Sequence, residues 1–143
     1  MIRQRLSMGP RQLVSLAANI AFAASAAVAG APPPPAAAAD AKNGQILYQS
    51  KCGGCHSLDA NRVGPLHRGV VGRPAGTAPG YNYSPALKRS GIVWSAAKLD
   101  RWLISPIKFV PGTRMGFSVS DARQRADIIA WLAANSPPQR NRK

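Results

Sequence analysis

The sequence Cys52-Gly53-Gly54-Cys55-His56 places two thiols three positions apart, with an imidazole directly after the second thiol. C-x-x-C-H is the attachment pattern for a c-type haem. Each thiol can add to one vinyl group on the same porphyrin edge, and His56 is then held under the iron as an axial ligand. Gly53 and Gly54 carry no side chains, so the loop can turn sharply beside the ring. The motif therefore predicts one covalently attached haem.

Other uses of these residues explain less of the pattern. A thioredoxin-like redox pair stands in a strand–helix–strand pattern, which the sequence does not show. A zinc site would need Cys52, Cys55, His56 and His67, whose histidine spacing does not match the usual zinc form. A disulfide across two residues would be strained and would leave His56 without a role.

The first 29 residues have the features of an export signal. An arginine-containing start is followed by the uncharged, alanine-rich run Leu13 to Val28, and Ala27-Val28-Ala29 fits the small-x-small cleavage rule. An uncleaved membrane anchor is the alternative, although the run is at or below the ~20 residues of a spanning helix. Both alternatives export the domain, which predicts a periplasmic protein, either free or tethered to the inner membrane.

The rest of the chain divides into a linker, a domain and a tail. Residues 30–39 form a stiff Pro/Ala-rich linker, residues 40–136 form the domain, and residues 137–143 form a basic tail. A domain this short can bury only a limited apolar core of its own. A covalently bound, apolar macrocycle would complete that core.

The charge of the chain is strongly positive. The formal net charge is +14, and it falls to +11 when residues 1–29 are removed. A net charge of this size influences which partners the protein attracts and how fast it meets them, and it carries no information about the fold. Aromatic residues are few and no nucleic-acid motif is present, so an exported acidic partner is favoured over nucleic acid.

The hydrophobic pattern predicts an all-α fold with three main helices and long loops wrapped around the haem. The helices are expected at Ala41–Lys51, Ala96–Ile104 and Asp121–Ala134, with Asp40, Ser95 and Ser120 as their N-caps. Pro106 should stop the second helix. Residues 57–94 are rich in glycine and proline and are expected to form loop.

Met115 is the candidate for the second axial ligand. It is the single methionine outside the export signal, in a turn-rich segment between the second and third helices. A thioether is a soft, neutral ligand that favours Fe(II). His67 is the rival, but it lies eleven residues from His56 and would have to cross the haem within a short loop. His67 is therefore expected to be a solvated surface residue.

With both ligands assigned, the chain resembles class I cytochrome c, in its mitochondrial and bacterial c2-like branch. The resemblance covers residues 40–134, and seven blocks occur in family order: Cys52-x-x-Cys55-His56, Val63-Gly64-Pro65-Leu66, Gly72-Arg73-x-x-Gly76, Ala78-Pro79-Gly80-Tyr81-x-Tyr83, Gly91-Ile92-Val93-Trp94, Pro111-Gly112-Thr113-x-Met115-x-Phe117 and Arg125-Ala126-Asp127-Ile128-Ile129-Ala130-Trp131-Leu132. It implies the cytochrome c fold, one haem c and a monomeric electron carrier.

The resemblance also implies roles for single residues. The Pro65 carbonyl would accept the ring N–H of His56, and Thr113 would support the methionine loop. The donors near the buried haem propionates would be Arg73, Tyr83 and Trp94. At the crossing of the first and last helices, Gly44 and Tyr48 would meet Ile128 and Trp131.

Two residues depart from the family pattern on the methionine side. Trp102 stands where a tyrosine is usual near the methionine, and its indole N–H can donate but not accept. Leu87 stands where an asparagine is common. Because both changes make this side more apolar, we expect a midpoint potential at least as high as that of relatives with the polar pair.

The basic positions around the exposed haem edge are partly retained. Lys51, Lys88, Lys108 and Arg114 match them, whereas Ile107 replaces a lysine. A ring of cations around an apolar patch would steer encounters with acidic redox proteins, namely an oxidase, a bc1-type complex or a periplasmic dehydrogenase.

The sequence therefore predicts a one-electron carrier cycling between Fe(III) and Fe(II), and not an enzyme. A peroxidase would need an open sixth position and a distal acid–base residue, for which no spare histidine or glutamate is placed. A haem sensor would normally be fused to an output domain.

Overall fold

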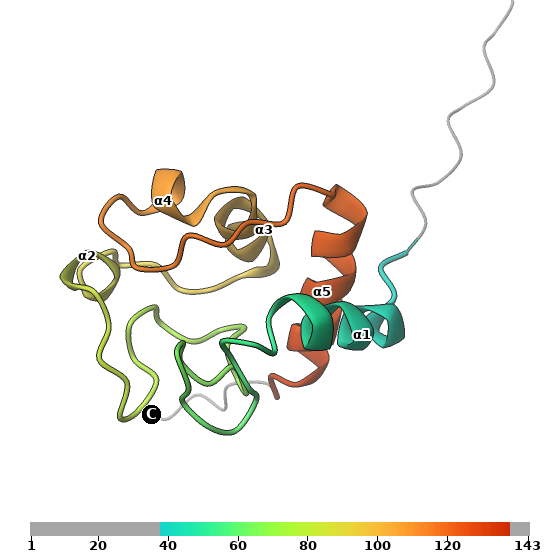
Figure 1. The fold of residues 1–143 in the computed structure, drawn as a ribbon, viewed down its shortest axis with the longest axis horizontal. Helices are drawn as coiled ribbons and strands as arrows, with labels where there is room; N and C mark the ends of the chain where they lie inside the picture. The colour runs from blue at the N-terminus through green and yellow to red at the C-terminus, as the bar shows by residue number, and fades with distance from the viewer. Residues whose placement is uncertain (1–37, 138–143) are drawn as a thin grey trace, which may run out of the picture. The chain divides into compact units, whose positions relative to one another are not determined.

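The computed structural model describes residues 38–137, which form helices joined by long loops (Figure 1). Within this range it contains no strand, only an isolated bridge between Pro74 and Val93. The helices are α1 (Ala41–Lys51), α2 (Pro85–Lys88), α3 (Ala96–Ile104), α4 (Pro106–Phe109) and α5 (Ala122–Ala134). The all-α fold class is confirmed, and α1, α3 and α5 are the three expected main helices.

The predicted signal, most of the linker and most of the basic tail lie outside the described residues. Within residues 38–137, no helix is long and apolar enough to cross a membrane. The division of the chain into signal, linker, domain and tail stays a prediction.

The main helices begin at polar caps, as expected, with one correction. Asp40 accepts hydrogen bonds from the N–H groups of the first turn of α1, and Ser95 caps α3 in the same way. The prediction that Ser120 caps the last helix is wrong, because the Asp121 carboxylate accepts from the Gln124 N–H at 2.8 Å. The Ser120 carbonyl instead accepts a hydrogen bond from the buried guanidinium of Arg125.

Two short helices were not expected. The Ser84 hydroxyl caps α2, so the prediction of continuous loop over residues 57–94 is wrong at Pro85–Lys88. Pro106 ends α3 as expected, but it also begins α4. Proline suits the first position of a helix because the missing N–H would have no partner there.

The first and last helices cross at Gly44, as predicted. A Cβ built on Gly44 would lie 1.9 Å from the Asp127 carbonyl oxygen, so only glycine allows this approach. The Tyr48 and Trp131 rings meet with centroids 4.3 Å apart. The Asp127 carboxylate, 1% exposed, accepts from the Asp40 N–H and the Asn43 amide, each at 2.8 Å. These contacts lock α1 onto α5.

A second polar tie joins α3, α5 and the segment before α5. Arg125 is buried, and its guanidinium donates to Asp100 on α3 and to the carbonyls of Val119 and Ser120. Its charge is thus paired while its N–H groups hold the chain that leads from Met115 into α5.

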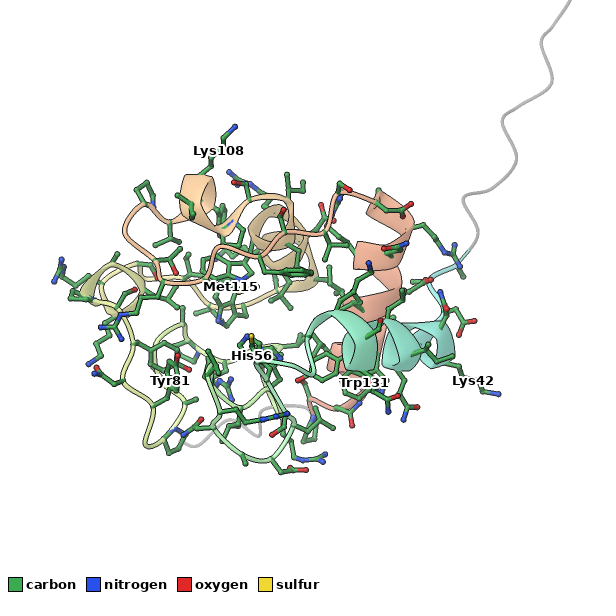
Figure 2. The ribbon with its side chains drawn as sticks, in the orientation of Figure 1. Lys42, His56, Tyr81, Lys108, Met115 and Trp131 are labelled. Atoms are coloured by element: carbon green, nitrogen blue, oxygen red, sulfur yellow. The ribbon has the colours of Figure 1, made fainter. Side chains whose placement is uncertain are left out.

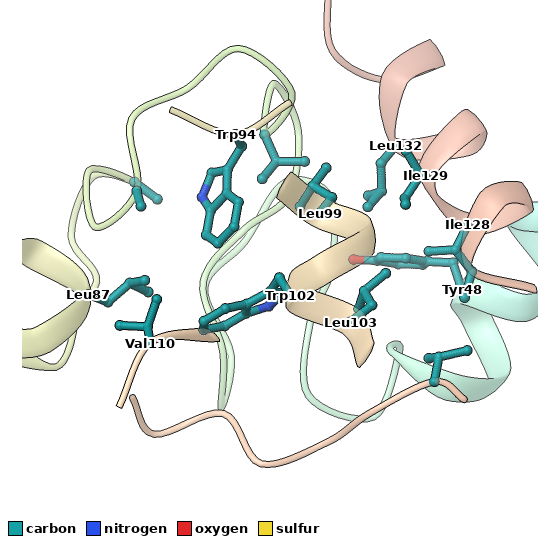
Figure 3. Packing of buried hydrophobic residues seen from close by; sticks show 14 of the residues in the cluster. Tyr48, Leu87, Trp94, Leu99, Trp102, Leu103, Val110, Ile128, Ile129 and Leu132 are labelled. Atoms are coloured by element: carbon teal, nitrogen blue, oxygen red, sulfur yellow. The ribbon is translucent and has the colours of Figure 1, made fainter. Parts of the chain in front are cut away.

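The buried apolar residues (Figure 3) pack around a central cavity. Trp94 and Trp102 meet edge to face at 5.2 Å, and Leu99 and Leu103 project from the same helix as Trp102. Each of these four residues is buried and also lines the central cavity. The fold therefore positions a cavity with largely apolar walls between α1, α3, α5 and the loops.

Candidate functional site

The Cys-x-x-Cys-His segment forms a tight turn at the end of α1. Cys52 is the C-cap of α1, and its carbonyl accepts from the N–H groups of Cys55 at 3.0 Å and His56 at 2.8 Å. Both cysteines are free thiols, Cys52 half-buried and Cys55 exposed. The turn therefore presents two thiols and an imidazole together.

The two glycines of this turn differ. A Cβ on Gly53 would lie 2.5 Å from the Gln49 carbonyl oxygen, whereas a Cβ on Gly54 would meet nothing within 4 Å. The expected need for glycine thus holds on steric grounds at Gly53 and not at Gly54.

The central cavity has a volume of about 590 Å³, within the ~300–1,000 Å³ range typical of cofactor sites. All the site residues predicted from the sequence line it: Cys52, Cys55, His56, Pro65, Arg73, Tyr83, Trp94, Trp102, Thr113 and Met115. These residues come from the loops that follow α1, α2 and α4 and from α3, so the fold brings together groups that are up to 63 positions apart. Figure 2 shows His56 and Met115 in the interior of the domain.

The His56 imidazole is held in one orientation. Its Nδ1 lies 2.8 Å from the Pro65 carbonyl oxygen, the hydrogen bond that the resemblance implies. A carbonyl can only accept, so Nδ1 carries the proton and Nε2 keeps its lone pair for a metal. Burial lowers the pKa of His56, and the bond to Pro65 opposes that shift. A Cβ on Gly64 would lie 2.1 Å from Cε1 of His56, so the chain passes against the ring.

Met115 lies in the helix-free segment between α4 and α5. It is half-buried and packs against the apolar core. The preceding turn uses Gly112 at φ +87°, a conformation that favours glycine, and the Thr113 N–H donates to the Val110 carbonyl at 3.1 Å. The Arg114 guanidinium donates to the Asn82 carbonyl at 2.8 Å, which ties this segment to the loop before α2.

Hydrogen-bond donors gather on another wall of the cavity. Backbone bonds join Arg73 and Trp94, since the Trp94 N–H donates to the Arg73 carbonyl at 3.0 Å. The Arg73 guanidinium donates to the Leu66 and Arg68 carbonyls. Burial lowers the pKa of Arg73 and raises that of Tyr83, so the tyrosine stays protonated at neutral pH. A buried carboxylate placed here would have donors within reach.

The methionine side of the cavity is apolar, as expected. Trp102 and Leu87 are 6% and 8% exposed and both line the cavity. Trp102 also packs edge to face on Phe109 at 6.4 Å. The consequence for the midpoint potential stays a prediction.

The prediction that His67 is a solvated surface residue is wrong. His67 is half-buried and lines the cavity. Its ring stacks on His56 with centroids 4.1 Å apart, and its Nδ1 lies 3.1 Å from the Tyr48 hydroxyl. The sequence offered one clue: His67 follows Pro65 by two positions, so a Pro65 carbonyl that contacts the His56 ring keeps the His67 backbone within about 7 Å of that contact.

The site therefore fits a haem better than a bare metal ion. Within residues 38–137, no group of three or more His, Cys, Asp or Glu side chains is placed to hold a metal. The zinc alternative is thus unsupported by the geometry. A largely apolar cavity with two thiols, an imidazole lone pair and a thioether suits a flat macrocycle with two axial ligands.

Comparisons with known proteins agree with this reading. The sequence model of one protein family, described as "Cytochrome c", matches residues 41–136. The chain is 47% identical over 96 residues to cytochrome c2 of Rhodopila globiformis, covering 65% of this chain and 91% of that protein. It is 45% identical over 96 residues to cytochrome c of Euglena viridis, covering 65% and 94%.

Solved structures give the same result. Cytochrome cH from Methylobacterium extorquens matches with a TM-score of 0.64 and 45% identity, over 66% of this chain and 98% of that one. Ferricytochrome c2 from Rhodopseudomonas palustris matches with a TM-score of 0.64 and 38% identity, over 67% and 98%.

Proposed function

This chain belongs to the cytochrome c family, and from that premise we propose that His56 and Met115 are the two axial ligands of its haem iron. The protein is a one-electron carrier with one covalent haem c. The observation that supports the ligand assignment is that both side chains line one cavity together with Cys52 and Cys55.

The haem, when bound, would supply the Fe(III)/Fe(II) couple for one-electron transfer between a donor and an acceptor. The residues of the chain would set the midpoint potential of this couple. Pro65 orients His56 and makes its imidazole more basic, which favours the oxidised state. The Met115 thioether favours the reduced state and raises the potential. Cys52 and Cys55 would hold the macrocycle through two thioether bonds.

Arg73, Tyr83 and Trp94 would donate hydrogen bonds to the haem propionates. Their wall carries N–H and O–H groups at buried or half-buried positions, where an unpaired carboxylate would be costly. Thr113 and Trp102 would complete the methionine side. With Met115 as the second ligand, the iron would offer no open site for substrate, which favours a carrier over an enzyme.

The axial ligands are tested on the full-length protein carrying its haem. In the oxidised wild type we expect a near-infrared absorption band from sulfur–iron bonding, and in the reduced form only slow binding of carbon monoxide. Met115→Ala should lose the band and bind carbon monoxide rapidly. A wild type that lacks the band, or a Met115→Ala protein that keeps it, would overturn the assignment.

The docking face is proposed around the mouth of the cavity. Lys51 and Arg114 line the cavity, and Lys88 and Lys108 are exposed on α2 and α4. Val63 and Phe117 also line it and are 76% and 48% exposed. An apolar patch ringed by cations suits acidic redox partners, namely an oxidase, a bc1-type complex or a periplasmic dehydrogenase, met by a monomer.

Salt dependence tests the docking face. Because the attraction is electrostatic, the rate of electron transfer to a bc1-type complex should fall as ionic strength rises. Lys108→Gln should slow the reaction several-fold at low salt and have little effect at high salt. Lys42→Gln is the matched control, since Lys42 lies on α1 far from Lys108 (Figure 2). A rate that does not change with ionic strength would refute this face.

The proposal also includes export of the domain to the periplasm. The apolar run within residues 1–29 and the Pro/Ala-rich linker support a periplasmic location, either after cleavage or tethered to the inner membrane. Whole-protein mass with haem staining of membrane and soluble fractions separates the two forms. Haem-stained protein confined to the cytoplasm would contradict both.

A further inference from the structure

His67 packs directly against the residue proposed as the axial ligand. The planes of the His67 and His56 imidazoles are 18° apart and their centroids 4.1 Å apart, which is a stacked arrangement. The Pro65 carbonyl meets the same His56 ring at its Nδ1 edge. His56 is therefore restrained in two ways, by a hydrogen bond at one edge and by a flat ring on one face.

His67 is itself held by Tyr48. The Tyr48 hydroxyl lies 3.1 Å from Nδ1 of His67, and the two rings meet edge to face at 5.7 Å. This distance allows a hydrogen bond between the hydroxyl and the imidazole, so Tyr48 anchors the His67 ring. The backbone N–H of His67 donates to the Ser57 carbonyl at 3.0 Å, which holds the His67 backbone in place.

Tyr48 in turn lies at the close crossing of α1 and α5. It is 4% exposed, and Trp131 packs on its ring at the crossing of α1 and α5. Its hydroxyl extends from α1 toward the interior (Figure 3). A continuous set of contacts thus runs from the helix crossing through Tyr48 and His67 to His56.

We propose that His67, anchored by the Tyr48 hydroxyl, is a positioning residue that fixes the plane of the His56 imidazole relative to the haem. This rests on the proposed function, because it takes His56 as an axial ligand. The bond to Pro65 limits where Nδ1 lies but leaves the ring able to tilt about the line joining Nδ1 and the carbonyl. A stacked neighbour on one face removes that freedom.

The orientation of an axial imidazole sets how unpaired spin is distributed over the haem, so the four haem-methyl resonances of the oxidised protein report it. The experiment compares proton NMR spectra of full-length wild type, His67→Leu, Tyr48→Phe and Trp131→Phe, each carrying its haem. Tyr48→Phe removes one oxygen atom and keeps the ring packing, so it carries the test even where His67→Leu fails to fold. Trp131→Phe is the matched control, because it alters packing on Tyr48 without removing the hydroxyl.

We expect His67→Leu and Tyr48→Phe to change the order or the spread of the four resonances by more than Trp131→Phe does. The near-infrared band should persist in all four proteins. Unchanged resonances in Tyr48→Phe, or an equal change in Trp131→Phe, would overturn the positioning role while leaving the axial ligands intact. A wild type without low-spin haem-methyl resonances would overturn the ligand assignment and this role together.

Discussion

Replacing Gly44 with alanine tests the closest contact in the fold. The added methyl carbon would lie 1.9 Å from the Asp127 carbonyl oxygen and 2.5 Å from its carbonyl carbon. Both obstacles are backbone atoms of α5, so neither can move away by rotating a side chain. Trp131 lies next to them, with its Cβ 3.0 Å from the new atom. The two helices must therefore separate by more than an ångström for the variant to fold.

Two opposing effects set how much stability the Gly44→Ala protein loses. Alanine gains about 1 kcal/mol over glycine in helix propensity. Overpacking typically costs about 1–3 kcal/mol, and a backbone obstacle puts this site at or above the top of that range. The separation also weakens the hydrogen bonds that Asp40 and Asn43 make to Asp127. We expect Gly44→Ala to lose about 2 kcal/mol or more, which lowers the melting temperature by about 8–16 °C for a domain of this size.

Thermal unfolding of the oxidised protein carrying its haem, followed by far-ultraviolet circular dichroism, measures this loss. Gln45→Ala is the matched control, since Gln45 is the exposed neighbour on the same helix and should change stability by less than about 0.5 kcal/mol. A Gly44→Ala protein that melts within about 2 °C of wild type would refute the steric reasoning.

Two further predictions concern single polar substitutions. The Asp40 N–H and the Asn43 amide lower the pKa of Asp127, so its carboxylate stabilises the fold above the usual aspartate range and loses that effect as pH falls through the lowered value. Asp127→Asn should therefore melt lower than wild type at pH 7, with a smaller further drop on acidification; identical pH profiles would count against this. Leu87→Asn brings a polar group to the methionine side and should lower the midpoint potential, by about 40 mV if the oxidised state gains about 1 kcal/mol. A redox titration giving an equal or higher potential for Leu87→Asn would contradict the apolar-wall argument.

The main helices and the cavity residues were accessible from the sequence because each carries a local or covalent constraint. Periodic apolar residues between a cap and a proline define a helix without tertiary information, as at Ala96–Ile104. The C-x-x-C-H pattern predicts a covalently attached haem. A haem requires axial ligands for its iron and hydrogen-bond donors for its propionates. Met115 is the single methionine outside the predicted export signal, which made it the candidate for the second ligand, and it lines the same cavity as His56.

The features that the sequence did not predict depend on tertiary contacts or on a choice between neighbouring residues. Ser120 and Asp121 are both good caps, and the choice follows from the Arg125 guanidinium, which takes the Ser120 carbonyl. The short helices α2 and α4 each begin at a proline, and at Pro106 the sequence predicted only the end of the preceding helix. His67 was misplaced because its partner hydroxyl lies 19 positions away on α1, and no periodicity connects a loop histidine to a helical tyrosine.

The crossing of α1 and α5 has a consequence for the order in which the protein matures. Its partners are 87 positions apart where Asp127 meets Asp40, so the crossing forms only after almost the whole domain has been synthesised. On its own, α1 has 11 residues, fewer than the ~12–15 at which isolated helices become marginally stable in water. Before α5 is present, α1 therefore lacks the helix that stabilises it, and the turn that carries Cys52 and Cys55 follows a helix without its packing partner.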